Sequence, residues 1–197
     1  MQYHNYKDDN PCISDKCHFS FTSYSIILTD MIIKDKLIKS SLFYDLSDDQ
    51  LDALTRLAVP CNFIQDDIVF EQNQYAEFLY IVLSGEICIQ FKPHDGDEIT
   101  VARVNEGGIC GWSSVLGRAI YTSAAICTQP SETLRFRGRE LQKLCESFPD
   151  TGIIIMERLA AVIAERLSNT NEKIMLLLSQ NLVGKNEFLK RRKNDNK

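Results

Sequence analysis

The feature that most limits the fold of this chain is a run of short hydrophobic segments, separated by turn residues, between residues 61 and 137. Ile68–Phe70 and Phe78–Leu83 are apolar throughout, and Ser84–Gly85 follows as a turn. Apolar and polar residues then alternate from Ile87 to Phe91, so this strand should have one buried side and one solvent-facing side. The succession predicts an all-β barrel or sandwich, and the number of segments favours an eight-stranded jelly-roll β-barrel.

Helical patterns lie on both sides of these segments. On the N-terminal side, Ser47 followed by Gln50 has the pattern of a capping box, in which each side chain binds an unpaired backbone N–H. Leu46 and Leu51 flank it as a hydrophobic staple, and Pro60 ends the helix. The expected fold class is therefore mainly β with flanking helices.

The C-terminal side is predicted to hold a short helix that Pro149 stops and then a long helix from Asp150 to Val183, with Gly184 as its C-cap. A helix of this length is too long to pack against one small barrel, so its apolar stripe predicts a homodimer seam. The expected segments are a poorly ordered leader (1–30), the barrel with its N-terminal helices (31–148), the long helix (149–184) and a basic tail (185–197). The tail is either a solvated helix end or a weak contact for nucleic acid or an acidic partner.

Composition indicates a soluble, cytoplasmic protein, since 44% of the residues are hydrophobic, 25% are charged, and no apolar run is long enough to span a membrane. The net charge of −5 argues against a general nucleic-acid surface. Seven scattered cysteines suit free thiols in a reducing compartment. Cys12, Cys17 and His18 lie close together, but a structural zinc site needs a second pair of ligands, so we expect no metal there.

Four segments carry a family resemblance: Leu37–Ser47, Phe70–Glu71, Phe78–Glu86 and Glu106–Gly111. They resemble, in this order, the entry helix, the second and third strands and the lead into the phosphate-binding cassette of the cyclic-nucleotide-binding domain family, which includes the catabolite activator protein and kinase regulatory subunits. The resemblance covers roughly residues 34 to 180. It implies the same jelly-roll barrel and a regulatory role in signal transduction.

In that family the cassette clamps its ligand with a Gly-Glu pair and, further on, an Arg-Ser or Arg-Ala pair. This chain keeps Gly111 but has Trp112 in place of the carboxylate, and Thr122 in place of the arginine, before Ser123 and Ala124. Both ionic contacts are missing, and each lost charged hydrogen bond costs about 1.5–3 kcal/mol. The Gly-Trp-Ser sequence resembles a bacterial subgroup of these domains.

Three interpretations of the cassette stay open. In the first, backbone N–H groups of Ser113 and Ser114 bind a cyclic nucleotide or another small anion, assisted by the Thr122 and Ser123 hydroxyls. Arg118 would then supply the missing cation, although it also has the pattern of a solvated loop residue. In the second, a flat or neutral ligand stacks on Trp112. In the third, Trp112 fills the pocket, the site is vestigial and the barrel only dimerises. The residues expected to bind a ligand are Val101, Gly111, Trp112, Ser113, Ser114, Arg118, Thr122, Ser123 and Ala124.

A non-catalytic regulatory module is the favoured function, with a cyclic nucleotide as a possible ligand, no other cofactor and an unknown protein partner. An enzyme of the cupin type would need two or three histidines facing the barrel interior, whereas His94 lies in a predicted hairpin turn. Only a short basic segment follows the long helix, so we expect no direct sequence-specific DNA binding and no membrane contact. The alternative is a dimerising interaction module without a small-molecule ligand.

Overall fold

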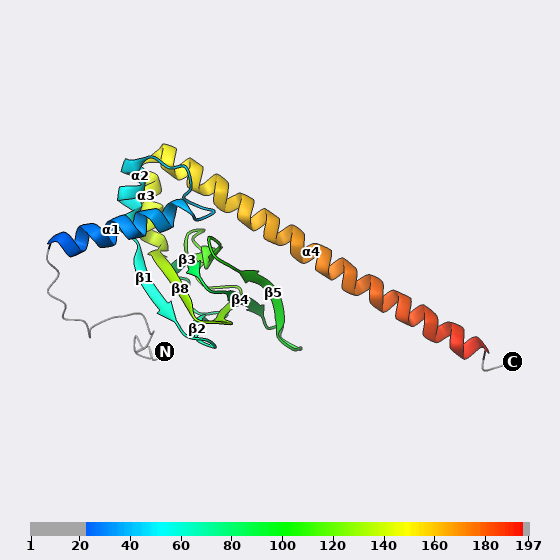
Figure 1. Ribbon diagram of the computed structural model, residues 1–197. Helices are drawn as coiled ribbons and strands as arrows, with labels where there is room; N and C mark the ends of the chain where they lie inside the picture. Colours follow the sequence, from blue (N-terminus) through cyan, green and yellow to red (C-terminus); the bar gives the residue numbers. More distant parts are fainter. Residues whose placement is uncertain (1–22, 195–197) are drawn as a thin grey trace, which may run out of the picture. The chain divides into compact units, whose positions relative to one another are not determined.

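The structure, a computed structural model, describes the backbone of residues 23–194 and the side chains of residues 31–172 (Figure 1). The chain divides into two compact units, residues 1–159 and residues 160–197. The first unit contains the β-structure and three helices, and the second consists of the greater part of one long helix.

Eight strands in the described part of the chain form two four-stranded sheets, in which every pair is antiparallel. One sheet has the order β1-β8-β3-β6 and the other β2-β7-β4-β5. This arrangement confirms the predicted eight-stranded, mainly β fold. The strands are β1 (Val59–Phe63), β2 (Ile68–Phe70), β3 (Phe78–Ser84), β4 (Ile87–Phe91), β5 (Ile99–Val104), β6 (Ile109–Cys110), β7 (Ala124–Cys127) and β8 (Ser131–Arg137).

The core between the sheets is aromatic, and it explains the continuous apolar run of β3. Tyr80 and Val82 point into this core, where the Tyr80 ring meets Phe63 and Phe70 at centroid distances of 6.4 and 5.9 Å. Their neighbours Leu79 and Ile81 face the other side of the sheet and are also fully buried. The strand is therefore covered on both faces.

Three helices gather at one end of the sheets in Figure 1: α1 (Ser23–Ile38), α2 (Asp48–Thr55) and α3 (Gly138–Ser147). The predicted capping box of α2 is confirmed, because Gln50 N–H donates to Ser47 Oγ and Ser47 N–H donates to Gln50 Oε1. The loop after α1 inserts Phe43, whose ring packs edge-on against Phe136 of β8 at 5.4 Å.

The long helix α4 (Pro149–Asn194) continues through Gly184, so the predicted cap at that glycine is wrong. A single glycine inside a helix costs only about 1 kcal/mol relative to alanine, and the basic residues that follow suit the negative end of the helix dipole. The backbone of residues 185–194 is therefore helical. At the other end of the chain, α1 begins at Ser23, inside the segment predicted as a leader.

Two other predictions differ from the structure. Leu37–Ser47 is the end of α1 followed by a turn, and not a helix of its own. In β4 the expected alternation fails at Cys88, which is buried with its thiol 3.6 Å from Thr100 Oγ1 of the neighbouring β5. It also fails at Phe91, which is 38% exposed at the end of the strand. Cys12, Cys17 and His18 lie outside the described residues.

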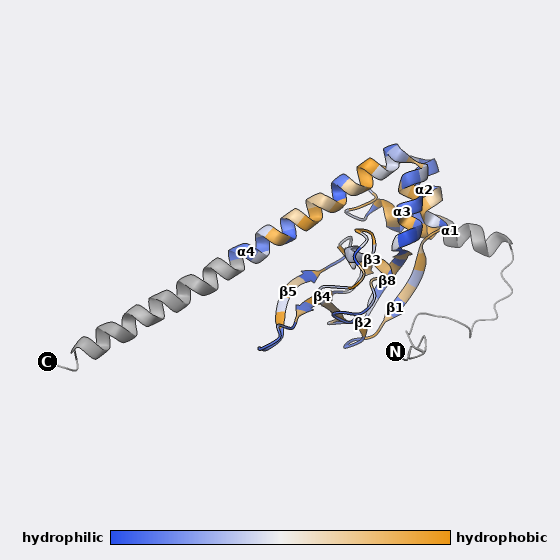
Figure 2. Cartoon of the chain, turned by 180° about the vertical axis from the view of Figure 1, so that it is seen from behind, coloured by the Kyte–Doolittle hydropathy of each residue, from blue (hydrophilic) through white to orange (hydrophobic). Residues whose placement is uncertain are grey.

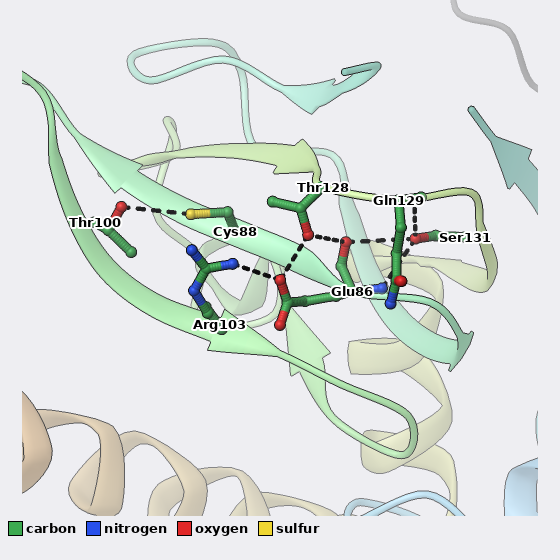
Figure 3. A network of polar contacts seen from close by, with 7 residues as sticks. All are labelled: Glu86, Cys88, Thr100, Arg103, Thr128, Gln129 and Ser131. Carbon is green, nitrogen blue, oxygen red and sulfur yellow. Dashed lines mark hydrogen bonds and ion pairs between the residues drawn. The ribbon is translucent and has the colours of Figure 1, made fainter. Parts of the chain in front are cut away.

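A polar network joins the β3–β4 turn to the β7–β8 turn (Figure 3). The Glu86 carboxylate accepts hydrogen bonds from Thr128 Oγ1 at 2.6 Å and from Arg103 at 2.5 Å, while Glu86 N–H donates to Ser131 Oγ at 3.2 Å. The Thr128 hydroxyl and then the Arg103 guanidinium hold the pKa of the Glu86 carboxyl below its ordinary value. The network requires a glycine at position 85, where φ is +89° and a Cβ would lie 2.3 Å from Ser131 Oγ.

Replacing Glu86 by glutamine should reduce the pH dependence of stability. Because the folded pKa of Glu86 is lowered, its contribution is complete above the unfolded pKa and is lost as the pH falls through the folded value. Urea unfolding measured from roughly pH 6 to pH 3 should show a shallower acid loss in Glu86→Gln than in the native chain. The exposed Glu106 provides the control, and a Glu106→Gln chain that flattens the curve equally would contradict the account.

Candidate ligand-binding cassette

The cassette, residues 111–124, connects β6 to β7 and begins with a turn that only glycine can make without strain. Gly111 has a φ of +78°, and a Cβ there would lie 2.5 Å from the carbonyl oxygen of Phe78. A short 3₁₀ turn, η1 (Trp112–Ser114), follows it. The sequence predicts this glycine as the start of the cassette, and the structure shows why a glycine is required there, since the β3 backbone lies directly against it.

The η1 turn is closed by hydrogen bonds within the cassette. Both the N–H and the hydroxyl of Ser114 donate to the Gly111 carbonyl oxygen, at 3.2 and 2.9 Å. Ser113 is buried, and its carbonyl accepts from the Arg118 N–H at 3.0 Å. An anion bound at this turn would therefore compete with Gly111 for the Ser114 N–H, one of the two backbone donors expected from the sequence.

Tyr121 fills the barrel interior beside Gly111 and is not among the residues predicted from the sequence. Its ring stacks on Phe70 with centroids 3.9 Å apart. Its hydroxyl donates to the Phe78 carbonyl at 2.8 Å and accepts from the Phe78 N–H at 2.9 Å. Burial raises the pKa of Tyr121 well above its ordinary value, so the phenol is neutral at all physiological pH values. The only sequence signal is an aromatic residue immediately before Thr122.

The other predicted ligand residues differ in exposure. Thr122 and Arg118 are exposed, while Trp112, Ser123 and Ala124 are partly buried. Ala124 is paired with Gln90 of β4, and Val101 of β5 packs against the core between the sheets. The structure thus brings Gly111, Trp112, Ser113 and Ser114 together in one turn, and places Thr122, Ser123 and Ala124 where the chain enters β7.

A pocket of about 420 Å³ lies against the middle of the cassette. Ser114 and Arg118 are the two predicted ligand residues among those that line it. The others are Gly117 and Ala119 of the cassette and residues from the segment before β3, the end of β8 and the start of α3. Arg118 therefore lies beside a pocket that the sequence did not indicate.

Neither metal chemistry nor a membrane span is supported within the part of the chain that the structure describes. It contains no group of three or more histidine, cysteine, aspartate or glutamate side chains that could hold a metal ion. His94 is exposed, as the hairpin prediction required. The described helices include none that combines the length and the apolar character needed to cross a bilayer.

Comparison with known proteins assigns the β-structure. Residues 60–148 match the family described as cyclic nucleotide-binding domain. This segment contains β1 without its first residue, the other seven described strands, the cassette and α3. The assignment confirms the resemblance that the cassette and strand motifs indicate.

Relatives of the domain include bacterial regulators. The CRP-like cAMP-activated global transcriptional regulator of Mycobacterium tuberculosis is 24% identical over 149 residues, which cover 76% of this chain and 65% of the regulator. The catabolite activator protein of Thermus thermophilus has a structure similar at a TM-score of 0.59, with 25% identity over 70% of this chain and 63% of that chain. A cyclic nucleotide-binding domain from Methylobacillus flagellatus shares the fold at a TM-score of 0.64 and 19% identity. The match covers 74% of this chain and 82% of that domain's chain.

Removing the Tyr121 hydroxyl should destabilise the domain. Tyr121→Phe keeps the ring on Phe70 but leaves the buried N–H and C=O of Phe78 without this partner, at a cost of about 2 kcal/mol. Urea unfolding at neutral pH measures the change. Tyr44→Phe, at an exposed ring, should cost less than about 0.5 kcal/mol, and equal losses in the two variants would contradict the role assigned to Tyr121.

Proposed function

We propose that this chain is a non-catalytic regulatory sensor that binds a cyclic nucleotide or another small anionic ligand through its non-standard cassette. The observation that carries the proposal is the cassette turn at Gly111, held in a left-handed conformation against β3 within a domain of the cyclic nucleotide-binding family. The name of the Mycobacterium tuberculosis relative, a cAMP-activated regulator, is consistent with this function.

The cassette offers mainly neutral groups to such a ligand. Thr122 and Ser123 provide hydroxyls at the start of β7, Ser113 provides a backbone N–H, and half-buried Trp112 provides a ring face for a base. Without the carboxylate and the guanidinium of the usual clamp, the two charged hydrogen bonds worth about 1.5–3 kcal/mol each are absent. We therefore expect affinity for cyclic AMP to be weak, and selectivity to depend on the base more than on the phosphate.

A second function is favoured by one observation. The Phe70–Tyr121 stack already fills the interior beside Gly111, which favours a ligand-free interaction module.

This alternative and the sensor share one property, a homodimer formed through α4. In the second unit, Leu167 is 61% exposed while Val162 and Ile163 are partly exposed. Figure 2 shows apolar and polar residues interspersed along the described part of this helix.

Restoring the charged clamp distinguishes the two functions. The double variant Trp112→Glu, Thr122→Arg should bind cyclic AMP at least ~100-fold more tightly than the native chain, because it regains two charged contacts. Isothermal titration calorimetry and thermal shift with cyclic AMP, cyclic GMP and cyclic di-GMP at about 1 mM measure both proteins, since a ligand of the folded state raises its stability.

The control for added charge is Gln129→Arg, in the exposed β7–β8 turn, which should leave binding unchanged. Weak but measurable binding by the native chain supports the sensor. Binding by the double variant alone supports the ligand-free module and rejects the sensor. Failure of both proteins to bind would show that the barrel cannot admit a cyclic nucleotide, and it would also reject the sensor.

A charged residue on the apolar stripe of α4 should weaken the proposed dimer. Leu167→Glu places a carboxylate where a second copy would bury leucine, and Asn169→Glu introduces the same charge at an exposed polar position of the same helix. Sedimentation velocity across a concentration series should show dissociation of Leu167→Glu at concentrations where the native chain and Asn169→Glu are dimers. A native chain that sediments as a monomer throughout would overturn the dimer.

A further inference from the structure

The pocket beside the middle of the cassette is lined by three arginines from two separate parts of the chain. Arg118 comes from the cassette, and Arg137 and Arg139 come from the junction of β8 and α3. These elements are in close contact, since a Cβ at Gly138 would lie 2.3 Å from the carbonyl oxygen of Ser114. The volume of about 420 Å³ is typical of small-molecule sites.

The charges in this pocket are not balanced. Glu77 pairs with Arg137 at 2.6 Å and neutralises it. Arg139 donates a hydrogen bond at 2.8 Å to the hydroxyl of Tyr75, which carries no charge. Within the described residues, the side chain of Arg118 has no hydrogen-bond or ion-pair partner. Two guanidinium groups therefore face the pocket without a counter-charge, and arginine keeps its proton at any physiological pH.

Two of the three guanidinium groups are already held in position. Arg137 is fixed by Glu77 and lies over the Phe78 ring at 5.3 Å, and Arg139 is fixed by Tyr75. Gln142 of α3 donates to the Val115 carbonyl at 2.5 Å, which ties the helix to the cassette on the same side. A ligand would have to order only Arg118, which reduces the entropic cost of binding.

We propose that this outer pocket binds a diphosphate group, free or as part of a nucleotide, between Arg118 and Arg139. Guanidinium groups bind phosphate oxygens through parallel charge-assisted hydrogen bonds, and two of them match a dianion. The exposed Tyr75 ring, at the rim, provides a face for a nucleoside attached to the diphosphate. The site shares Ser114 and Arg118 with the predicted cassette residues, but none of Gly111, Trp112, Thr122, Ser123 and Ala124 lines it.

The test is isothermal titration calorimetry of the full chain with inorganic pyrophosphate and with ADP, at low ionic strength. The native chain should bind pyrophosphate, and Arg118→Gln and Arg139→Gln should each lose roughly tenfold or more in affinity. Arg56→Gln removes an exposed arginine that does not line the pocket and should bind as the native chain does. Tighter binding of ADP than of pyrophosphate would identify a nucleotide, and equal binding would identify the diphosphate alone as the recognised group.

The outcome does not depend on cyclic-nucleotide binding at Trp112 and Thr122. Pyrophosphate should bind in the presence of saturating cyclic AMP and to Trp112→Glu, even if the native chain binds no cyclic nucleotide. The proposal is wrong if the native chain gives no heat with about 1 mM pyrophosphate or ADP, or if Arg56→Gln loses as much affinity as Arg118→Gln. Circular dichroism of each variant confirms that it is folded, and the exposed position of Arg118 makes that variant the decisive one.

Discussion

The backbone of Glu77 and Phe78, at the start of β3, holds both the cassette and the beginning of α3 in place. The Phe78 carbonyl lies against Gly111 at the start of the cassette, and the backbone N–H and C=O of the same residue bind the Tyr121 hydroxyl near its end. The Glu77 carbonyl accepts the N–H of Gly138, where α3 begins. Both ends of the cassette and the first turn of α3 therefore contact two consecutive residues, and a side chain at Gly111 would clash with the Phe78 carbonyl and crowd the Tyr121 ring.

The barrel interior beside Gly111 is aromatic, where the family's charged clamp would be expected. Phe70 and Tyr121 stack next to Gly111, and the Tyr121 hydroxyl bonds to both the N–H and the C=O of Phe78. Three basic side chains, Arg118, Arg137 and Arg139, line the pocket between the cassette and α3. A ligand in the interior would meet hydroxyls, backbone N–H groups and aromatic faces, whereas a ligand in the outer pocket would meet arginines. The two proposed sites thus differ in chemistry as well as in place.

Much of the fold could be predicted because its signals are local. The capping box at Ser47 and Gln50, the continuous apolar run of β3 and the turn at Gly85 each depend on neighbours in sequence. The end of α4 could not be predicted in this way. One glycine lowers helix stability only slightly, and the residues after Gly184 are compatible with a helix. The start of α1 was missed because its residues show almost no separation of apolar and polar faces.

The candidate site was only partly predictable, for a physical reason. The resemblance located the cassette, because glycine is required wherever the backbone takes a left-handed turn against another strand. Tyr121, Arg137 and Arg139 were not found, since their roles depend on contacts with Phe78, Glu77 and Tyr75, which are far away in sequence. Such contacts arise from sheet register and leave no periodic pattern in the chain.

The central claim, that the cassette binds a small anionic ligand, is tested most directly by nuclear magnetic resonance of the ¹⁵N-labelled full chain titrated with cyclic AMP. The account predicts saturable shifts of the amide signals of Gly111, Trp112 and Ser113 and of Thr122, Ser123 and Ala124. Amide signals in α2, which is remote from the cassette in sequence, serve as the internal reference. Cassette signals that stay unchanged at saturating nucleotide, or shifts confined to residues elsewhere, would contradict it.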